Sequence, residues 1–94
     1  MPYIHPATRD LLQPTLRETP ANAGALNYCF TKIIDDYLVA NGLSYSRINE
    51  VIGALECCKL ELYRRVAAPY EETKIEANGD VYSEKLLTKP ETKI

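Results

Sequence analysis

The residues with the clearest capacity for chemistry form a basic and aromatic cluster: Lys59, Tyr63, Arg64, Arg65 and Tyr70. Guanidinium groups bind phosphate oxygens through paired hydrogen bonds, and aromatic rings stack on bases or cations. The combination therefore indicates a site for a phosphate-bearing small ligand such as a nucleotide. Aromatic residues beside arginines are also typical of protein interfaces, and a solvated helix face has the same composition. All three interpretations stay open.

The three cysteines and the single histidine do not form a pattern for metal binding or disulfide pairing. Cys57 and Cys58 are adjacent, so they would point to different sides of a helix, and the number of cysteines is odd. His5 lies far from all of them, and zinc sites need ligands at close, regular spacing. We expect buried free thiols in a reducing compartment, with no metal and no cofactor.

No catalytic motif is present. The sequence lacks the glycine-rich phosphate loops and any cysteine–histidine or serine–histidine pair with a third partner. Helical nucleotide pyrophosphatases need carboxylates repeated on one inward helix face, but Glu50 and Glu61 fall on the expected solvent side and Glu56 falls elsewhere. We therefore expect a protein that is not an enzyme.

Two amphipathic helices must position these residues. Apolar residues recur at steps of three and four over residues 22–41, and Gly42 follows as a typical helix end. Ser44 is a good N-cap for a second helix that runs to about residue 67. Pro69 is expected to break or kink it, a further helix covers residues 70–77, and Asn78-Gly79 ends that helix.

These elements predict an all-α fold. A link of about three residues requires the two long helices to pack as an antiparallel hairpin or small bundle. The prolines of the first twenty residues allow only short helices, near residues 6–13 and 14–18. We expect one domain over residues 1–87, with its core in residues 22–78, and a flexible tail over residues 88–94.

The second long helix has two organised faces. One is an apolar stripe that includes Ile48, Ile52 and Leu55 and is expected to pack on the first helix. Lys59 falls within this stripe, so we expect it to be partly buried beside Asp36 or another carboxylate. Whether that role is structural or ligand-binding stays open.

The other face carries Gly53, Cys57 and Leu60. Glycine inside a helix costs about 1 kcal/mol relative to alanine, so it usually serves a purpose. Two small residues one turn apart would let another backbone approach closely. Either a terminal segment of this chain or a second subunit is expected to cover this face.

Composition restricts the partners. The chain has 94 residues, is 46% hydrophobic and 26% charged, and carries a net charge of −2. General nucleic-acid binding usually requires a basic excess, so it is not expected. No apolar run approaches the roughly 18 residues of a membrane span. We expect a cytoplasmic protein without membrane association.

The segments LNY, GLSYS, INEVIG, LEC, KLELYRRV, APYE and NGDVY follow one another over roughly residues 24–82. In these segments the chain resembles a family of small uncharacterised bacterial and phage proteins without a known activity. The resemblance implies no catalytic residue, and it favours a phage or mobile-element origin. The leading hypothesis is a self-associating, non-enzymatic helical binding protein, because the chain is small, lacks catalytic groups and has a helix with two organised faces. The alternative is a small-ligand or nucleotide-binding protein that uses the basic cluster.

Overall fold

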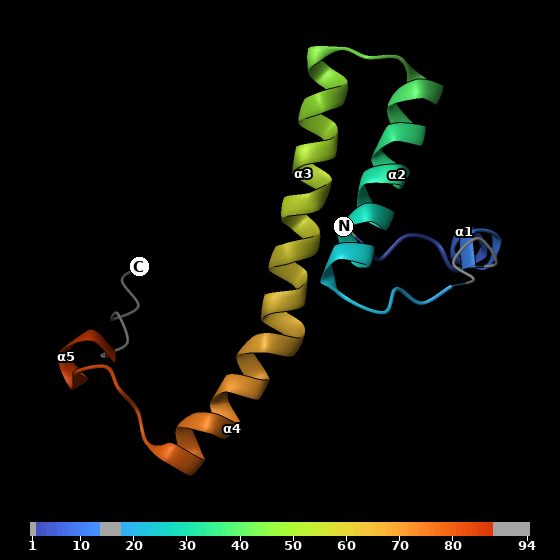
Figure 1. The fold of residues 1–94 in the computed structure, drawn as a ribbon. Coiled ribbons are helices and arrows are strands. Elements are labelled where there is room, and N and C mark those ends of the chain that lie inside the picture. Colours follow the sequence, from blue (N-terminus) through green and yellow to red (C-terminus); the bar gives the residue numbers. More distant parts are fainter. Residues whose placement is uncertain (1, 14–17, 88–94) are drawn as a thin grey trace. The chain divides into compact units, whose positions relative to one another are not determined.

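The computed structural model describes residues 2–13 and 18–87, and this part of the chain is all-α. The elements in chain order are α1 (Pro6–Leu12), α2 (Ala23–Asn41), α3 (Tyr45–Leu62), the π-helix η2 (Tyr63–Ala67), α4 (Ala68–Asn78) and α5 (Glu84–Leu87) (Figure 1). The predicted helix near residues 14–18 and the predicted tail over residues 88–94 lie largely or wholly outside the described residues. None of the described helices is long and apolar enough to cross a bilayer.

Local capping defines the ends of α2. The side chain of Asn22 accepts a hydrogen bond from the backbone N–H of Ala25 at 2.8 Å, which satisfies a first-turn donor. At the other end Gly42 has a φ of 91°, and its N–H donates to the carbonyl oxygen of Leu38 at 2.8 Å. Only glycine adopts this backbone conformation without strain. Both predicted helix boundaries are confirmed.

A side-chain cap also defines the start of α3. Ser44 Oγ accepts a hydrogen bond from the backbone N–H of Arg47 at 3.1 Å. Three residues connect Asn41 at the end of α2 to Tyr45 at the start of α3. Because this connection is short, the two helices form an antiparallel hairpin (Figure 1). The predicted antiparallel hairpin is confirmed, but the expected close packing of α2 on α3 is not found.

Pro69 does not end the second long helix. The helical backbone continues from Tyr45 to Asn78, and η2 widens it immediately before the proline. The N–H of Ala68 donates to the carbonyl oxygen of Tyr63, five residues back. In a regular α-helix the ring of Pro69 would clash with the carbonyl four residues earlier, so the wider turn provides room for it. Of the predicted break or kink at Pro69, the break is wrong, and a π-helical segment precedes the proline instead. The predicted end at Gly79 is confirmed by its φ of 87°.

The chain divides into two compact units, Met1–Glu61 and Leu62–Ile94. In the first unit the N-terminal segment reaches α3, where the hydroxyl of Tyr3 donates to Oε1 of Glu61 at 2.8 Å. His5 caps α1, since its Nδ1 accepts from the N–H of Ala7 at 3.1 Å. The short first helix is therefore tied to the hairpin through the residues that precede it.

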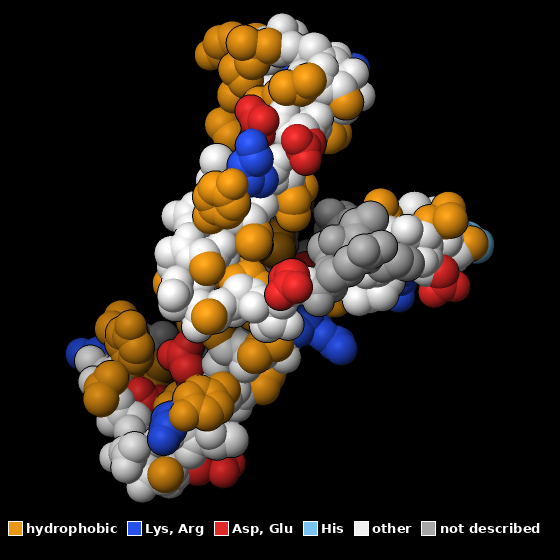
Figure 2. All heavy atoms as spheres, turned by 45° about the vertical axis from the view of Figure 1, so that its right-hand side comes forward, with side chains coloured by type: hydrophobic (Ala, Val, Ile, Leu, Met, Phe, Trp, Pro, Cys, Tyr) orange, Lys and Arg blue, Asp and Glu red, His pale blue; other side chains and the backbone are white. Residues whose placement is uncertain are grey.

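The described residues do not include a single buried side chain. The best-covered positions, among them Cys29, Ile34 and Leu38 on α2 and Val51 and Cys57 on α3, are only half-buried. Figure 2 shows hydrophobic side chains on the surface of the molecule in many places. The predicted apolar stripes are thus present, but within one chain they do not close into a core.

Candidate functional site

An apolar groove lies between α2 and α3. Its volume is about 300 Å³. The walls are almost entirely apolar and are formed by Phe30, Ile33, Ile34 and Tyr37 on α2 and by Glu50, Val51, Ala54 and Leu55 on α3. Interiors of folded proteins rarely leave unfilled space of this size between neighbouring elements. The two helices are therefore joined into a hairpin without filling the space between them.

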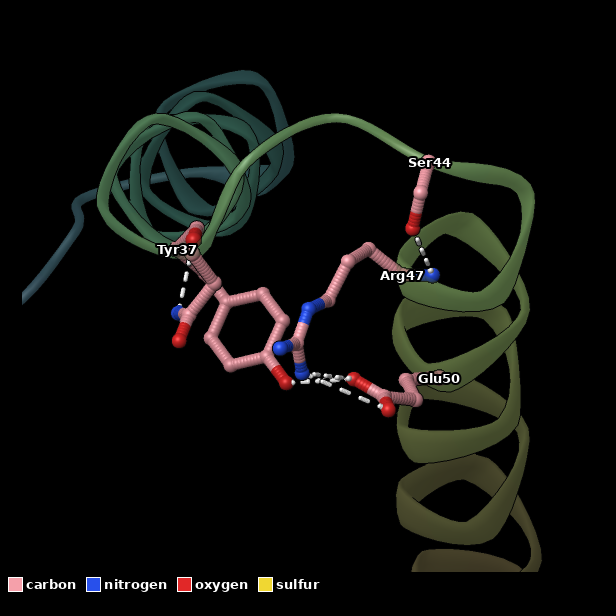
Figure 3. A network of polar contacts seen from close by, with 5 residues as sticks. Tyr37, Ser44, Arg47 and Glu50 are labelled. Carbon is pink, nitrogen blue, oxygen red and sulfur yellow. Dashed lines mark hydrogen bonds and ion pairs between the residues drawn. The ribbon is translucent and has the colours of Figure 1, made fainter.

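A polar network connects the helices at one end of this groove (Figure 3). The hydroxyl of Tyr37 donates to Oε2 of Glu50 at 2.7 Å, and Nη1 of Arg47 lies 3.1 Å from the same oxygen. Asn41 donates from its side-chain amide to the carbonyl oxygen of Tyr37 at 2.9 Å. Tyr37 thus belongs to the groove wall through its ring and to the network through its hydroxyl.

The network shifts the ionisation of its members. The pKa of Glu50 is lowered, first by the hydrogen bond from Tyr37 and then by that from Arg47, since both stabilise the carboxylate. The pKa of Tyr37 is raised, chiefly because its proton is held by Glu50. The pKa of Arg47 is also raised by the hydrogen bond to Glu50. Sequence reasoning missed this network, although the spacing of Arg47 and Glu50 by three residues was a readable signal.

Around the groove lies a larger exposed surface, which we call the hairpin apolar surface. It consists of seven large residues whose exposed fractions range from 39% to 59%. They follow one side of each helix at steps of three and four, which brings successive residues together. Its members are Leu26, Phe30, Ile33 and Tyr37 on α2 and Ile48, Ile52 and Leu55 on α3.

The structure corrects the predicted orientation of α3. Leu55 of the predicted stripe lines the groove, as expected. Glu50, expected on the solvent side, faces α2, whereas Ile52, expected against α2, is 59% exposed and does not line the groove. At 100° per residue the groove-lining positions are turned by about 90° from the centre of the predicted stripe. The bond between Tyr37 and Glu50 accompanies this orientation. An apolar strip of α3 is therefore left uncovered.

The predicted burial of Lys59 is wrong for the same reason. Its side chain is 68% exposed, and its Nζ pairs with Oε1 of Glu56 at 3.0 Å. Lys59 is nine residues after Glu50, so the two side chains point to nearly opposite sides of the helix. The expected carboxylate partner is present, but it is Glu56 of the same helix and not Asp36 of α2.

The other members of the basic and aromatic cluster have separate surroundings. Tyr63, Arg64 and Arg65 lie in η2, where consecutive side chains point in different directions. The neighbouring Glu71 raises the pKa of Tyr63 by its charge and by a hydrogen bond. The ammonium group of Lys74 lies 5.5 Å from the centre of the Tyr70 ring, so this ring faces a cation of its own helix.

The predicted interface face of α3 is open at its centre. A Cβ atom added to Gly53 would meet no other atom within 4 Å. Leu60 is 57% exposed, while Cys57 is half-buried. The N-terminal segment reaches only the edge of this face, through the bond of Tyr3 to Glu61. The face is accessible, but Leu60 is its only large apolar residue.

The thiols are free, and their predicted burial is wrong. Cys58 is exposed, and Cys29 and Cys57 are half-buried. Over residues 2–13 and 18–87, no three histidine, cysteine or acidic side chains gather closely enough to hold a metal ion. The apolar groove and its surroundings are therefore the candidate functional site.

A family model described as "Domain of unknown function (DUF6899)" matches residues 1–81, which include α1 to α4 and the whole hairpin. The chain belongs to this family. The family match confirms the resemblance to an uncharacterised domain and assigns no activity to it. Comparisons with curated proteins and with solved structures give no match.

Proposed function

We propose that this family member is a non-enzymatic helical binding protein that acts as a homo-oligomer. One observation carries the proposal: the described residues include no buried side chain, while seven large apolar residues of the hairpin stay 39–59% exposed. A folded chain gains its stability mainly by removing apolar surface from water. A partner that covers the hairpin would supply the burial that the single chain lacks.

The size of the exposed surface supports this interpretation. With about 200 Å² for each large apolar residue, the hairpin apolar surface offers about 600 Å². The largest apolar patch of an ordinary monomer measures roughly 300–600 Å², and it is often a functional site. Small domains commonly complete their cores by association. The hairpin apolar surface is thus as large as the largest apolar patches of ordinary monomers, which are often functional.

The polar groups support a structural role better than a catalytic one. Tyr37, Arg47 and Glu50 satisfy one another, and their contacts connect α2 to α3. A catalytic group needs a pKa matched to proton transfer near neutral pH. The shifts in this network go the other way, because Glu50 becomes more acidic and Tyr37 less acidic.

Sedimentation or light scattering over a range of about 1 to 100 μM tests the proposal, since micromolar binding corresponds to about 8 kcal/mol. We expect a species with at least twice the 10.6 kDa of the chain. Far-ultraviolet circular dichroism should show helix content that increases as the species assembles. A folded, cooperative monomer at every concentration would refute self-association.

The π-helix favours a second candidate function, the binding of a phosphate-bearing small ligand. Such segments are rare and frequently mark functional sites, and this one carries Tyr63, Arg64 and Arg65. Thermal-shift measurements with a panel of nucleotides test it, because a ligand that binds the folded state raises the melting temperature. Replacement of Arg65 by Gln should abolish any shift that is found. A flat response to the whole panel removes this candidate.

We also infer a cytoplasmic location and a phage or mobile-element origin. The support is the resemblance of the sequence to small bacterial and phage proteins and the presence of three free cysteines, which suit a reducing compartment. Sequencing the genes that flank the coding region tests the origin. Fractionation of the native cells tests the location.

A further inference from the structure

We propose that the groove between α2 and α3 receives α3 of a second copy, so that two hairpins complete one four-helix bundle about a two-fold axis. The inference rests on the proposed self-association and names the surface that performs it. It concerns the hairpin apolar surface and not the face around Gly53.

The groove is suited to an apolar helix. Seven of the eight residues that line it present carbon surface, and the eighth, Glu50, is already bonded to Tyr37 and Arg47. Its volume of about 300 Å³ greatly exceeds the 10–15 Å³ that holds one water, and it accommodates several aliphatic side chains. An occupant with a row of branched apolar residues would exclude water along its length.

The chain itself presents such a row. Ile48, Ile52 and Leu55 on α3 are 40%, 59% and 43% exposed, and their spacing of four and three residues places them on one side of the helix. A helix that docks in a groove uses anchors at this spacing. Leu55 also lines the groove, so the row and the groove adjoin on the same helix. A two-fold axis can therefore place the row of each copy against the groove of the other.

The areas agree with a dimer. A specific interface of standard size buries about 800 Å² on each partner, and the hairpin apolar surface provides about 600 Å² before polar atoms at the rim are added. The Gly53 face provides much less, because Leu60 is its only large apolar side chain. The larger apolar surface is the one that a second copy would cover.

The charges near the row do not oppose this docking. Lys59 follows Leu55 by one helical turn, and its ammonium group is paired with Glu56 at 3.0 Å. Its exposed side chain can lie along the edge of the bundle with the charge in water. The network of Arg47 and Glu50 is internally satisfied at the loop end of the hairpin. The row between these two ion pairs is free of unpaired charge.

A matched pair of variants tests which surface is used. Ile52→Glu and Leu60→Glu change residues of equal size on the same helix, with exposed fractions of 59% and 57%. Sedimentation should show that Ile52→Glu weakens dimerisation at least about 100-fold, because a carboxylate would enter an apolar contact. Leu60→Glu should remain a dimer. Circular dichroism at high concentration checks that both variants stay helical.

A fluorescent reporter tests the groove independently of these variants. The chain has no tryptophan, so Phe30→Trp places a single reporter in the groove wall. Its emission should shift to shorter wavelength as concentration increases through the dimerisation range. Tyr45→Trp, at a position that is 83% exposed and outside the groove, should keep a solvent-like emission and serves as the control.

The outcomes separate the two proposals. A wild-type chain that stays monomeric removes both. A wild-type dimer that survives Ile52→Glu but dissociates with Leu60→Glu preserves self-association and overturns the groove as its site. Emission from Phe30→Trp that stays solvent-like in the assembled protein likewise overturns the groove.

Discussion

The hydroxyl of Tyr37 on α2 donates to Oε2 of Glu50 on α3 at 2.7 Å, and this bond connects two helices across a short loop. The contact turns Glu50 toward α2. Since Lys59 lies nine residues farther along a helix of 3.6 residues per turn, it points to nearly the opposite side of α3 from Glu50. The bond between Tyr37 and Glu50 thus accompanies an orientation of α3 that leaves Ile52 exposed.

Removal of the tyrosine hydroxyl should raise the pKa of Glu50. The hydrogen bond from Tyr37 is the largest cause of its lowered pKa, and Arg47 is the next. In Tyr37→Phe the carboxylate loses its main donor, so the pKa should return toward the ordinary value of 4.5. Carbon-detected NMR titration of the Glu50 carboxyl group measures this. Arg47→Met, as a comparison, should produce a smaller increase, and the reverse order would contradict the geometry.

The same bond should make stability depend on pH at both ends of the scale. The pKa of Glu50 is lowered by folding, so its contribution is present above the unfolded pKa and is lost as the pH falls through the folded pKa. The pKa of Tyr37 is raised, so its contribution is present below the unfolded value and is lost as the pH rises through the folded pKa.

Thermal unfolding of the wild type and Glu50→Gln from about pH 2 to about pH 11 measures this dependence. Their difference in melting temperature should be greatest near neutral pH and smaller at acidic pH, where the wild-type carboxylate is protonated. A difference that is constant over the whole range would show that the bond is not formed in solution.

The N-cap of α3 should contribute measurably to stability. Ser44 Oγ accepts from the N–H of Arg47 at 3.1 Å, and loss of such a cap typically costs about 1 kcal/mol. Ser44→Ala should therefore lower the free energy of unfolding in urea by about that amount. Ser46→Ala changes the same residue type two positions later without removing the capping oxygen. An equal loss in both variants would argue against the cap.

Two glycines should respond to alanine with opposite sign. Gly42 has a φ of 91°, which an L-residue adopts only at a cost of about 1–2 kcal/mol, so Gly42→Ala should destabilise the hairpin. Gly53 lies inside α3 with open space around it, and Gly53→Ala should stabilise the protein by up to about 1 kcal/mol. Urea unfolding measures both. Loss of assembly in Gly53→Ala would instead place a partner backbone against that face.

Local chemistry made the helices predictable from sequence. Each helix boundary depends on residues within one turn of it, as at the caps Asn22 and Ser44 and at Gly42 with its positive φ. The residue types at these positions therefore predict the boundaries. The break that Pro69 was expected to cause is absent, because the sequence shows that its ring needs space but does not show that the helical turn over Tyr63–Ala67 widens to provide it. The polar network was missed, since it joins residues on different helices.

The sequence by itself determined the all-α class, the two long helices and the three-residue link, because these follow from hydrophobic spacing and short-range hydrogen bonds. Only the tertiary structure decided how α3 is turned about its axis. An apolar helix with residues on several sides can face its neighbour in more than one orientation, and a long-range contact selects among them. Here Glu50 rather than Ile52 faces α2, and the groove and the exposed row follow from that orientation.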